Sequence, residues 1–492
     1  MSVNRFFIII CCLFLSISCS INNYSPTKKF SKERLQNDFS LLKKVLEEKH
    51  TSLYWYSSKD SIDLYFNRYL NEIKDSMTEQ AFAWKIISPL LNKIKCGHTS
   101  VSMSKKYYKW EKHQKFKSFP YHLKIWADSM AVSGQQSLRD TFLKRGTIIK
   151  SVNGLNVDVL KNKIFDCFPQ DGNATNISYI RLSANFPYFY RNLFGNCDNY
   201  EVNYIDSSGK NSVVVIPEYN PASDTLNKSP AIKIKQAPIS KFHKLEQYRS
   251  FEIDSTGAFA IMRLNTFSKG RLRNFFRESF KTMRQEHIPN LILDIRINGG
   301  GRVSTSTLLT KYLSNTSFKV ADSVYAKTNT LSPYTKHFKN KFINNFQFLF
   351  IARKHKDALF HLNRYESKYY PIKKRNHFNG KSYVLINGPT FSASCLFSNA
   401  IKGQKGITFV GEETGGGLYG NNGIMIPDFK LPYSKLRVRI PLFRIVQFHH
   451  VKEKGSGIMP DIYVPTNYDA LVKGYDKKMT LVKQLILQSF KK

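Results

Sequence analysis

Ser392 has the surroundings that point most directly to chemistry. It stands after an apolar, β-rich run and a Gly-Pro break, and before a helical pattern. One face of that expected helix is formed by Ala393, Leu396, Phe397, Ala400 and Ile401. A serine at the first turn lies beside free backbone N–H groups and the positive end of the helix dipole, which would stabilise an oxyanion. The segment therefore predicts a nucleophile elbow. The alternative is that Ser392 and Ser394 only cap the helix.

His98 is the second residue with suitable chemistry. A helical pattern stops at Gly97 and an alternating pattern follows, so His98 is expected at a helix-to-strand junction. An imidazole that is uncharged near neutral pH can accept a hydroxyl proton and return it to a leaving group. Isolated histidines are more often structural, and the local pattern by itself leaves both readings open.

Several distinct regions must bring these two residues together. Strand and helix patterns alternate after residue 250, which indicates β-α-β crossovers in a multidomain α/β protein. We expect a signal peptide at 1–18, a tether at 19–28, a helical N-terminal domain at 29–114, a β-rich module at 115–217, a linker at 218–249, and an α/β core at 250–492 with an insertion at 330–379. The insertion would be a lid over the site or a helical elaboration. The stretch from Asp469 to Lys492 is expected to form an amphipathic helix.

The charge balance is extreme. The 492 residues include 75 Lys and Arg against 36 Asp and Glu, a formal net charge of +39. The basic residues are scattered and no nucleic-acid motif is present, so we expect no nucleic-acid partner. An anionic membrane surface or an acidic polymer is a better match than nucleic acid, but we prefer the simpler interpretation, a solvated basic surface without a specific ligand.

The N-terminus reads as an export signal. Arg5 precedes an apolar stretch from Phe6 to Leu15, which is too short for a comfortable membrane span. Ser16 to Cys19 resembles a bacterial lipobox, so we expect Cys19 to be lipidated and to anchor the protein to a membrane of the cell envelope, as a periplasmic or outer-membrane lipoprotein. A plain cleaved signal and an uncleaved anchor are the alternatives.

Four cysteines belong to the folded body: Cys96, Cys167, Cys197 and Cys395. No CxxC or Cys/His metal spacing occurs, and we expect no metal or cofactor. Export would permit a disulfide between Cys167 and Cys197, but free buried thiols are the equal alternative.

Six motifs in order resemble the tail-specific, or C-terminal-processing, serine peptidase family, which shares its core with tricorn protease. The motifs are KCGHTS at 95–100, GTIIKSVNG at 146–154, LILDIRINGGG at 291–301, GPTFSAS at 388–394, FVGEETGGG at 409–417 and GSGIMPDIYV at 455–464. The resemblance implies a PDZ-like module at 115–217, a ClpP/crotonase-like core, and a polypeptide substrate cut near its C-terminal tail. The oligomeric state stays open.

The resemblance also implies a catalytic set. One branch of the family uses a Ser/Lys dyad, but Gly417 stands where that lysine would be, and Lys402 is roughly 15 Å along a helix from Ser392. The Ser/His branch then implies His98 as the general base of Ser392. Glu453 would orient the imidazole, or would be a solvated partner of nearby lysines. The backbone N–H groups of Ala393 and of the glycine loop, at Gly299 or Gly300, would form the oxyanion hole.

The expected function is an exported serine endopeptidase that works by acyl-enzyme chemistry. A catalytically silent envelope protein that grips peptides on the same fold is the main alternative, because the lysine is missing and Glu453 is in imperfect register. A polyanion-binding protein is a third class, for which affinity would depend strongly on salt.

Overall fold

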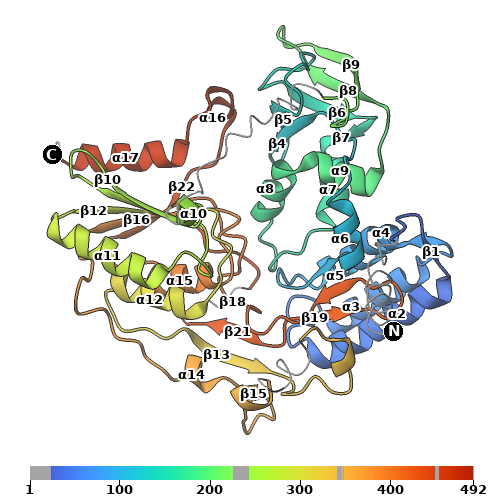
Figure 1. The fold of residues 1–492 in the computed structure, drawn as a ribbon. Coiled ribbons are helices and arrows are strands. Elements are labelled where there is room, and N and C mark those ends of the chain that lie inside the picture. Colours follow the sequence, from blue (N-terminus) through green and yellow to red (C-terminus); the bar gives the residue numbers. More distant parts are fainter. Residues whose placement is uncertain (1–23, 225–242, 341–345, 347, 449–453, 491–492) are drawn as a thin grey trace, which may run out of the picture.

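The computed structural model describes residues 24–224, 243–340, 346, 348–448 and 454–490. It confirms a multidomain α/β architecture with several sheets. Figure 1 shows the N-terminal helices in blue, a β-rich module in teal and green beside them, and a sheet-and-helix core across from that module. Cys19 and Glu453 both fall outside the described residues. Within the described chain, no helix combines the length and apolar character needed to cross a membrane.

The N-terminal region is mainly helical because its apolar residues recur at helical spacing. Leu35, Phe39 and Leu42 of the first long helix are buried in one cluster. Side-chain caps start the later helices, as where the Thr78 hydroxyl accepts the Ala81 N–H. The elements are β1 (Lys29–Phe30), α2 (Lys32–Lys49), α3 (Lys59–Asn71), β2 (Met77–Thr78), α4 (Glu79–Phe82), the π-helix η1 (Ala83–Ile87), α5 (Ser88–Lys93), β3 (Ser100–Ser102) and α6 (Lys105–Glu111).

The β-rich module is an antiparallel sheet packed against three helices. Its strand order is β4-β5-β6-β8-β9, with β7 paired to β6. The elements are β4 (Tyr121–Ile125), β5 (Met130–Gln135), β6 (Ile148–Val152), β7 (Leu155–Asn156), α7 (Val157–Phe165), α8 (Asn176–Ala184), α9 (Phe186–Phe194), β8 (Asn199–Ile205) and β9 (Asn211–Pro217). Its core is rich in aromatic rings, with Phe119 in edge-on contact with Tyr200 at a centroid distance of 5.1 Å.

The core is built on a second sheet, of order β10-β11-β12-β16-β17-β22. All its neighbouring strands run parallel except β10 and β11. The elements are α10 (His243–Glu246), β10 (Arg249–Ile253), β11 (Ala260–Leu264), α11 (Leu272–Gln285), β12 (Asn290–Asp294), α12 (Val303–Leu313), β16 (Lys381–Ile386), α15 (Ala393–Ile401), β17 (Ile407–Gly411), β22 (Ile462–Tyr463), α16 (Tyr468–Lys473) and α17 (Lys477–Ser489).

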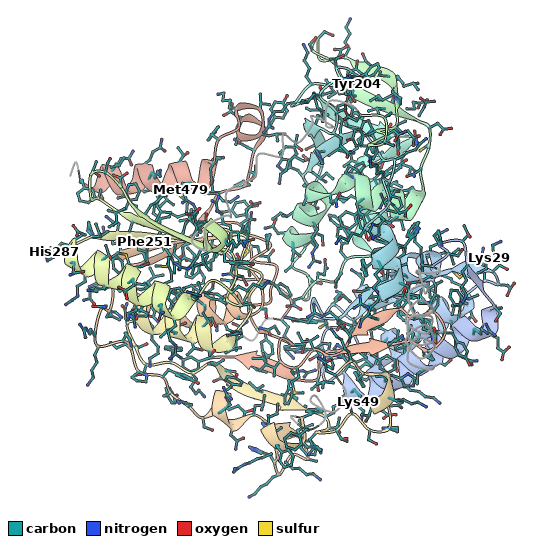
Figure 2. All side chains as sticks on the ribbon, in the orientation of Figure 1. Lys29, Lys49, Tyr204, Phe251, His287 and Met479 are labelled. Atoms are coloured by element: carbon teal, nitrogen blue, oxygen red, sulfur yellow. The ribbon has the colours of Figure 1, made fainter. Side chains whose placement is uncertain are left out.

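Both faces of this sheet are covered. Successive strand residues point to opposite faces, so Leu291 joins the cluster beneath α11, α12 and α15, whereas Ile292 joins the one beneath α17. Figure 2 shows Met479 on α17, which belongs to the second cluster, and Phe251 on β10, which packs against the first. The carboxyl ends of β12 and β16 lead into the glycine loop and the Ser392 turn.

Two smaller sheets link the core to the N-terminal region. The first has the order β14-β15-β13-β21-β18 and the second the order β19-β20-β3. Their elements are β13 (Ala321–Ala326), the 3₁₀ helix η2 (Thr335–His337), β14 (Arg353–Lys354), β15 (Phe360–His361), α14 (Asn363–Glu366), β18 (Gly420–Asn421), β19 (Asp428–Lys430), β20 (Arg437–Arg439) and β21 (Arg444–Gln447). Pairing of β15 with β13 joins the described part of the 330–379 insertion to the core.

The C-terminal stretch is divided, so the expectation of one helix after Asp469 is wrong. Gly474 is left-handed, with φ +71°, and ends α16, because glycine tolerates this conformation. The Asp476 side chain then accepts the Met479 N–H and starts α17.

The described cysteines are all unpaired. Cys167 donates to the Trp84 carbonyl at 3.4 Å, and Cys197 accepts a hydrogen bond from Asn153 at 3.2 Å. Of the two alternatives left open by the sequence, the structure has the free thiols.

Candidate active site

Ser392 occupies a strained turn between β16 and α15. Its φ of 58° and ψ of −120° are outside the regions that residues with a Cβ ordinarily adopt. Although it is the N-cap residue of α15, its side chain makes no capping hydrogen bond. Ser394 instead donates its hydroxyl to the Asn298 carbonyl at 2.9 Å. Neither serine therefore caps the helix, and the Ser392 hydroxyl is not used by the backbone.

The glycine loop after β12 holds this turn in place. The Phe391 N–H donates to the Asn298 carbonyl at 3.1 Å, beside the Ser394 bond to the same oxygen. Gly300 has φ +93°, and a Cβ there would lie 2.8 Å from the Ser392 Cβ and 2.8 Å from the Ala393 nitrogen. Only glycine permits so close an approach between the two loops.

The three amides expected to face an oxyanion differ in their bonding. The Gly300 N–H donates to Asn298 Oδ1 at 3.0 Å and is already used. The Ala393 and Gly299 N–H groups have no acceptor within the described chain. Space beside the Gly299 α-carbon is open, whereas Gly300 packs on the serine. Ala393 and Gly299 are thus the amides available to a ligand.

His98 comes from the distant N-terminal region but lies close to Ser392. A Cβ placed on Gly423 would be 2.8 Å from the Ser392 Oγ and 3.2 Å from the His98 Nε2. The serine oxygen and the imidazole nitrogen are therefore at most about 6.0 Å apart, the sum of those two distances. No hydrogen bond joins them in the described structure, and catalytic bonds are often long before substrate binds. The ring also packs against Phe391, with centroids 4.8 Å apart.

The electrostatic setting keeps the His98 imidazole neutral. Burial, followed by the positive charge of Arg439, lowers its pKa from the usual 6.5 to about 3. Arg439 is on β20, where it pairs with Ser100, two residues beyond His98. The Nδ1 atom is buried and has no hydrogen-bond partner in the described structure. A buried imidazole nitrogen without a partner is costly, so the described residues leave the site incomplete at this atom.

Each residue that flanks His98 is held by a different part of the chain. The Gly97 N–H donates to Asp171 Oδ1 at 2.7 Å, from the β-rich module. Thr99 Oγ1 is 2.7 Å from the Nε2 of buried His50. Because His50 Nδ1 accepts the Ser52 N–H, its Nε2 carries the proton and donates to Thr99. The β-rich module and the N-terminal region thus together fix the backbone on either side of the imidazole.

Asp171 is a buried carboxyl group at the centre of this arrangement. Its Oδ1 accepts the Gly97 N–H, and its Oδ2 is buried without a hydrogen-bond partner in the described structure. Burial raises its pKa to about 7, although the nearby backbone N–H groups of Gly97 and Gly417 act to lower it. The carboxyl group therefore changes its charge near neutral pH, and it contacts Gly97, the residue before His98.

The loop after Asp171 also reaches the segment that follows Glu453. Asn173 donates its N–H to the Gly455 carbonyl at 2.7 Å, and Gly172 donates to the Lys95 carbonyl at 3.0 Å. The same short loop therefore contacts both the residues before His98 and the first described residues after Glu453. Glu453 itself lies outside the described residues.

Three contributors were missed from the sequence. Gly423 separates the serine from the histidine, and Asp171 and His50 position the residues on either side of His98. The Asn-Asn-Gly run at 421–423 is the one available signal, since it marks a tight turn close to a glycine-rich segment. Nothing local distinguishes Asp171 or His50 from other polar residues.

The described residues contain no group of three or more His, Cys, Asp or Glu side chains arranged to hold a metal ion.

Comparison with known proteins gives one family and one fold. Residues 258–464 match the sequence model of peptidase family S41, a range that contains Ser392 but not His98. No curated protein matches the chain. The structure of mature CPAF complexed with lactacystin is similar, with a TM-score of 0.63, 13% identity, and coverage of 93% of this chain and 98% of that chain. The CPAF S499A mutant has a TM-score of 0.61, 14% identity, and coverage of 93% and 97%. These likenesses show the fold, which extends over nearly the whole chain.

Proposed function

We propose that this chain is a serine-type peptidase of family S41, whose sequence model matches residues 258–464. Ser392 is the nucleophile and His98 is its general base. The Ser392 Oγ attacks the scissile carbonyl carbon while its proton passes to the His98 Nε2. Collapse of the tetrahedral intermediate breaks the C–N bond, and the amine leaves with that proton. Water, deprotonated by the same imidazole, then hydrolyses the acyl ester and restores the serine.

The observation that carries this proposal is the space beside Gly423. The missing side chain leaves a gap that borders both the Ser392 Oγ and the His98 Nε2. A strained serine at a helix N-terminus, next to a neutral imidazole, is the combination that acyl transfer needs. A serine and a histidine in purely structural roles would not require an empty position between them.

The remaining parts of the mechanism are an oxyanion hole and a third catalytic group. The Ala393 and Gly299 N–H groups are the proposed donors to the oxyanion, since both are unbonded in the described chain, and Gly300 supports the turn. Glu453 is the proposed partner of His98 Nδ1. That atom needs an acceptor, and a carboxylate there would raise the pKa of the imidazole from about 3 toward neutrality as it becomes cationic.

The proposed substrate is an extended polypeptide cut near its C-terminal tail, with the β-rich module acting as a PDZ-like capture domain. Its outer strand β9 pairs only with β8 among the described strands, which suits binding by strand addition. We expect an unfolded peptide with a free C-terminal carboxylate to be cleaved with a lower KM than its amidated form. Equal KM values would argue against recognition of the tail.

The decisive experiment is covalent labelling with a fluorophosphonate probe. Wild type should react, while Ser392→Ala should not react at all and His98→Ala should react at least about 100-fold more slowly. His122→Ala is the matched control, because His122 is exposed on β4. Glu453→Gln should slow the reaction without abolishing it, since it removes the charge that stabilises the imidazolium.

The same experiment tests the alternative function. A folded wild type that does not react, yet binds extended peptides, would support a silent peptide-binding protein of the cell envelope. Labelling that persists in Ser392→Ala would place the nucleophile elsewhere.

The proposal also includes export from the cytoplasm and anchoring to a membrane. Cys19 is proposed to be lipidated, which would hold the enzyme at a membrane of the cell envelope. Radiolabelled palmitate should enter the wild-type protein during expression in a bacterial host and should be absent from Cys19→Ala. Equal incorporation would contradict this anchor.

A further inference from the structure

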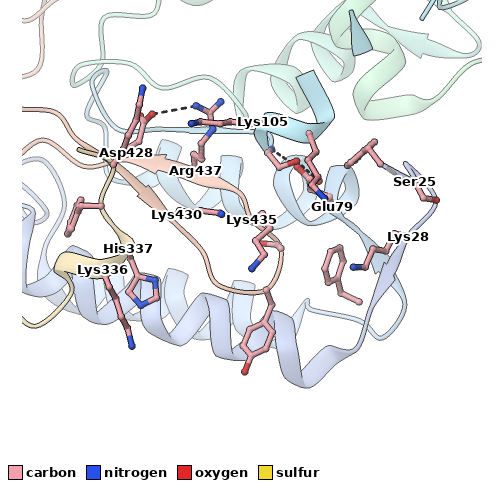
Figure 3. Close-up of a pocket in the computed structure, with 18 residues that line it drawn as sticks. Ser25, Lys28, Glu79, Lys105, Lys336, His337, Asp428, Lys430, Lys435 and Arg437 are labelled. Carbon is pink, nitrogen blue, oxygen red and sulfur yellow. Dashed lines mark hydrogen bonds and ion pairs between the residues drawn. The ribbon is translucent and has the colours of Figure 1, made fainter. Parts of the chain in front are cut away.

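A cavity of about 460 Å³ lies away from the candidate active site, between the N-terminal region and the β19–β20 hairpin. Its walls come from five stretches of chain: the residues around β1, the start of α4, the start of α6, η2 with its neighbours, and the hairpin itself. Figure 3 shows these stretches meeting, with the ammonium groups of Lys28, Lys430 and Lys435 turned toward the middle of the cavity. Neither Ser392 nor His98 lines it.

The lining is strongly cationic. Eight of its residues are basic and two are acidic; the basic ones are Lys28, Lys105, Lys106, Lys336, Lys339, Lys430, Lys435 and Arg437. Both carboxylates are already engaged. Glu79 accepts the Ser104 N–H at 2.5 Å and the Ser104 hydroxyl at 3.1 Å, while Asp428 faces Arg437 at 3.5 Å. The acids therefore leave most of the positive charge uncompensated.

Individual lysines at this site lack counter-ions. Lys105, Lys336 and Lys430 form no ion pair with any described residue. Gathering several like charges around one concave space is unfavourable unless an anion occupies it, because the positive potentials add and the protein walls reduce screening.

Hydrogen bonds tie the hairpin side of the cavity to the N-terminal region. The buried carboxylate of Asp38, on α2, accepts the N–H groups of Tyr433 and Ser434 at 2.9 and 2.7 Å. It also accepts the Ser434 hydroxyl at 2.6 Å, so the hairpin turn is tied to the helix at three points. Arg437 donates its Nε–H to the Met103 carbonyl at 3.2 Å. The backbone that carries the hairpin's basic residues is thus held in place by contacts that involve no ligand.

Aromatic side chains complete the walls. Phe30, Phe338 and Tyr433 line the same space as the lysines. The volume falls within the range of about 300–1,000 Å³ that is usual for small-molecule sites. A bare surface charge would need neither a concavity nor apolar walls, so the combination indicates a compact ligand with both anionic groups and a less polar part.

We propose that this cavity binds a phosphorylated small molecule that carries at least two closely spaced phosphate groups. Lysine ammonium groups bind phosphate oxygens as point charges, and several of them are needed to match a multivalent anion. A long acidic polymer would be bound by the scattered surface charge instead, and would not depend on this cavity. The site goes beyond the peptidase activity and does not require it.

The test uses the full chain and sodium tripolyphosphate as the probe. The pocket variant is Lys336→Gln with Lys430→Gln, and the control is Lys244→Gln with Lys281→Gln, two exposed lysines on α10 and α11 that lie outside the cavity. Both double variants lose the same net charge, and all four side chains are exposed, so folding should be retained. Binding is measured by calorimetry and by the rise in Tm relative to NaCl at equal ionic strength.

We expect wild type and the control variant to bind tripolyphosphate with similar Kd values, and the pocket variant to bind at least about ten-fold more weakly. Equal Kd values in the two double variants would overturn the proposal, because the scattered surface charge would then be the binding site. An unchanged Tm in wild type at saturating probe would overturn it as well. Neither result depends on peptidase activity, so the two proposals fail separately.

Phosphate groups of this kind occur both on soluble metabolites and on lipid headgroups. Co-sedimentation with vesicles that contain phosphatidylinositol 4,5-bisphosphate, whose headgroup carries neighbouring phosphates, would support the proposal with a headgroup as the source if the pocket variant alone weakens it. Tripolyphosphate binding that is sensitive to the pocket variant, with vesicle binding that is not, would support it with a soluble ligand as the source.

Discussion

The backbone N–H of Gly97 donates to Oδ1 of Asp171 at 2.7 Å, across 74 positions of the sequence. This bond joins the loop before His98 to the β-rich module, and the neighbouring Asn173 joins the module to Gly455. The position of the imidazole therefore depends on a domain that contributes no candidate nucleophile or base. A shift of this loop would move His98 relative to Ser392, and catalytic rates are sensitive to displacements of about 1 Å.

Gly423→Ala should block the approach of the serine to the histidine. The new methyl group would lie 2.8 Å from the Ser392 Oγ and 3.2 Å from the His98 Nε2. We expect fluorophosphonate labelling to slow at least about 100-fold. Gly134→Ala is the matched control, since a Cβ there meets no atom within 4 Å. Equal labelling rates in the two variants would show that the gap is not used for proton transfer.

Asp171→Asn should change how stability depends on pH. Burial raises the pKa of this carboxyl from 3.8 to about 7, so the folded protein binds an extra proton between those values, and its contribution to stability falls as pH rises through that window. Asparagine keeps the acceptor oxygen without the charge. We expect the free energy of unfolding of the variant, relative to wild type, to increase between pH 4 and pH 8 by up to the order of 4 kcal/mol.

Urea unfolding at several pH values measures that difference. A constant offset between the two proteins across the range would mean that the carboxyl group does not titrate there. Labelling rates recorded on the same samples separate an effect on the base from an effect on folding.

Thr99→Val should destabilise the protein, because it removes the acceptor of the His50 Nε2–H, which is 2.7 Å away in a buried site. An unpaired buried donor costs about 1–3 kcal/mol. Thr316→Val, at an exposed position, should stay within about 0.5 kcal/mol of wild type. Chemical denaturation distinguishes the two. A Thr99 variant as stable as the Thr316 variant would show that His50 finds another acceptor.

When the protein is unfolded without a reductant, an alkylating reagent should modify all four cysteines that lie between residues 96 and 395. Cys96, Cys167, Cys197 and Cys395 are free in the structure, and Cys167 and Cys197 each contact a different partner. Peptide mapping by mass spectrometry should find all four thiols labelled. Protection of Cys167 and Cys197 together, reversed by a reductant, would indicate the disulfide that an oxidising compartment permits.

Local patterns were sufficient to predict much of the candidate site. The turn at Ser392 follows from a strand pattern, a Gly-Pro break and a helical pattern, all within twenty residues. The end of a helical segment near Gly97 could also be predicted, because helical periodicity and helix-breaking residues are visible within one or two turns of the sequence. The prediction of one helix after Asp469 was wrong because the helical pattern continues across a break in the helix. Gly474 ends α16 and the Asp476 cap starts α17, although the apolar residues on both sides recur at helical spacing.

The sequence by itself determined which residues have nucleophilic and basic chemistry, and which segments form the sheet that carries them. Only the tertiary structure decided that Gly423 leaves the space between Ser392 and His98, and that Asp171 and His50 hold the residues on either side of the imidazole. These contacts join segments separated by dozens to hundreds of positions. Such contacts are set by how whole sheets and helices pack, and no local periodicity encodes them.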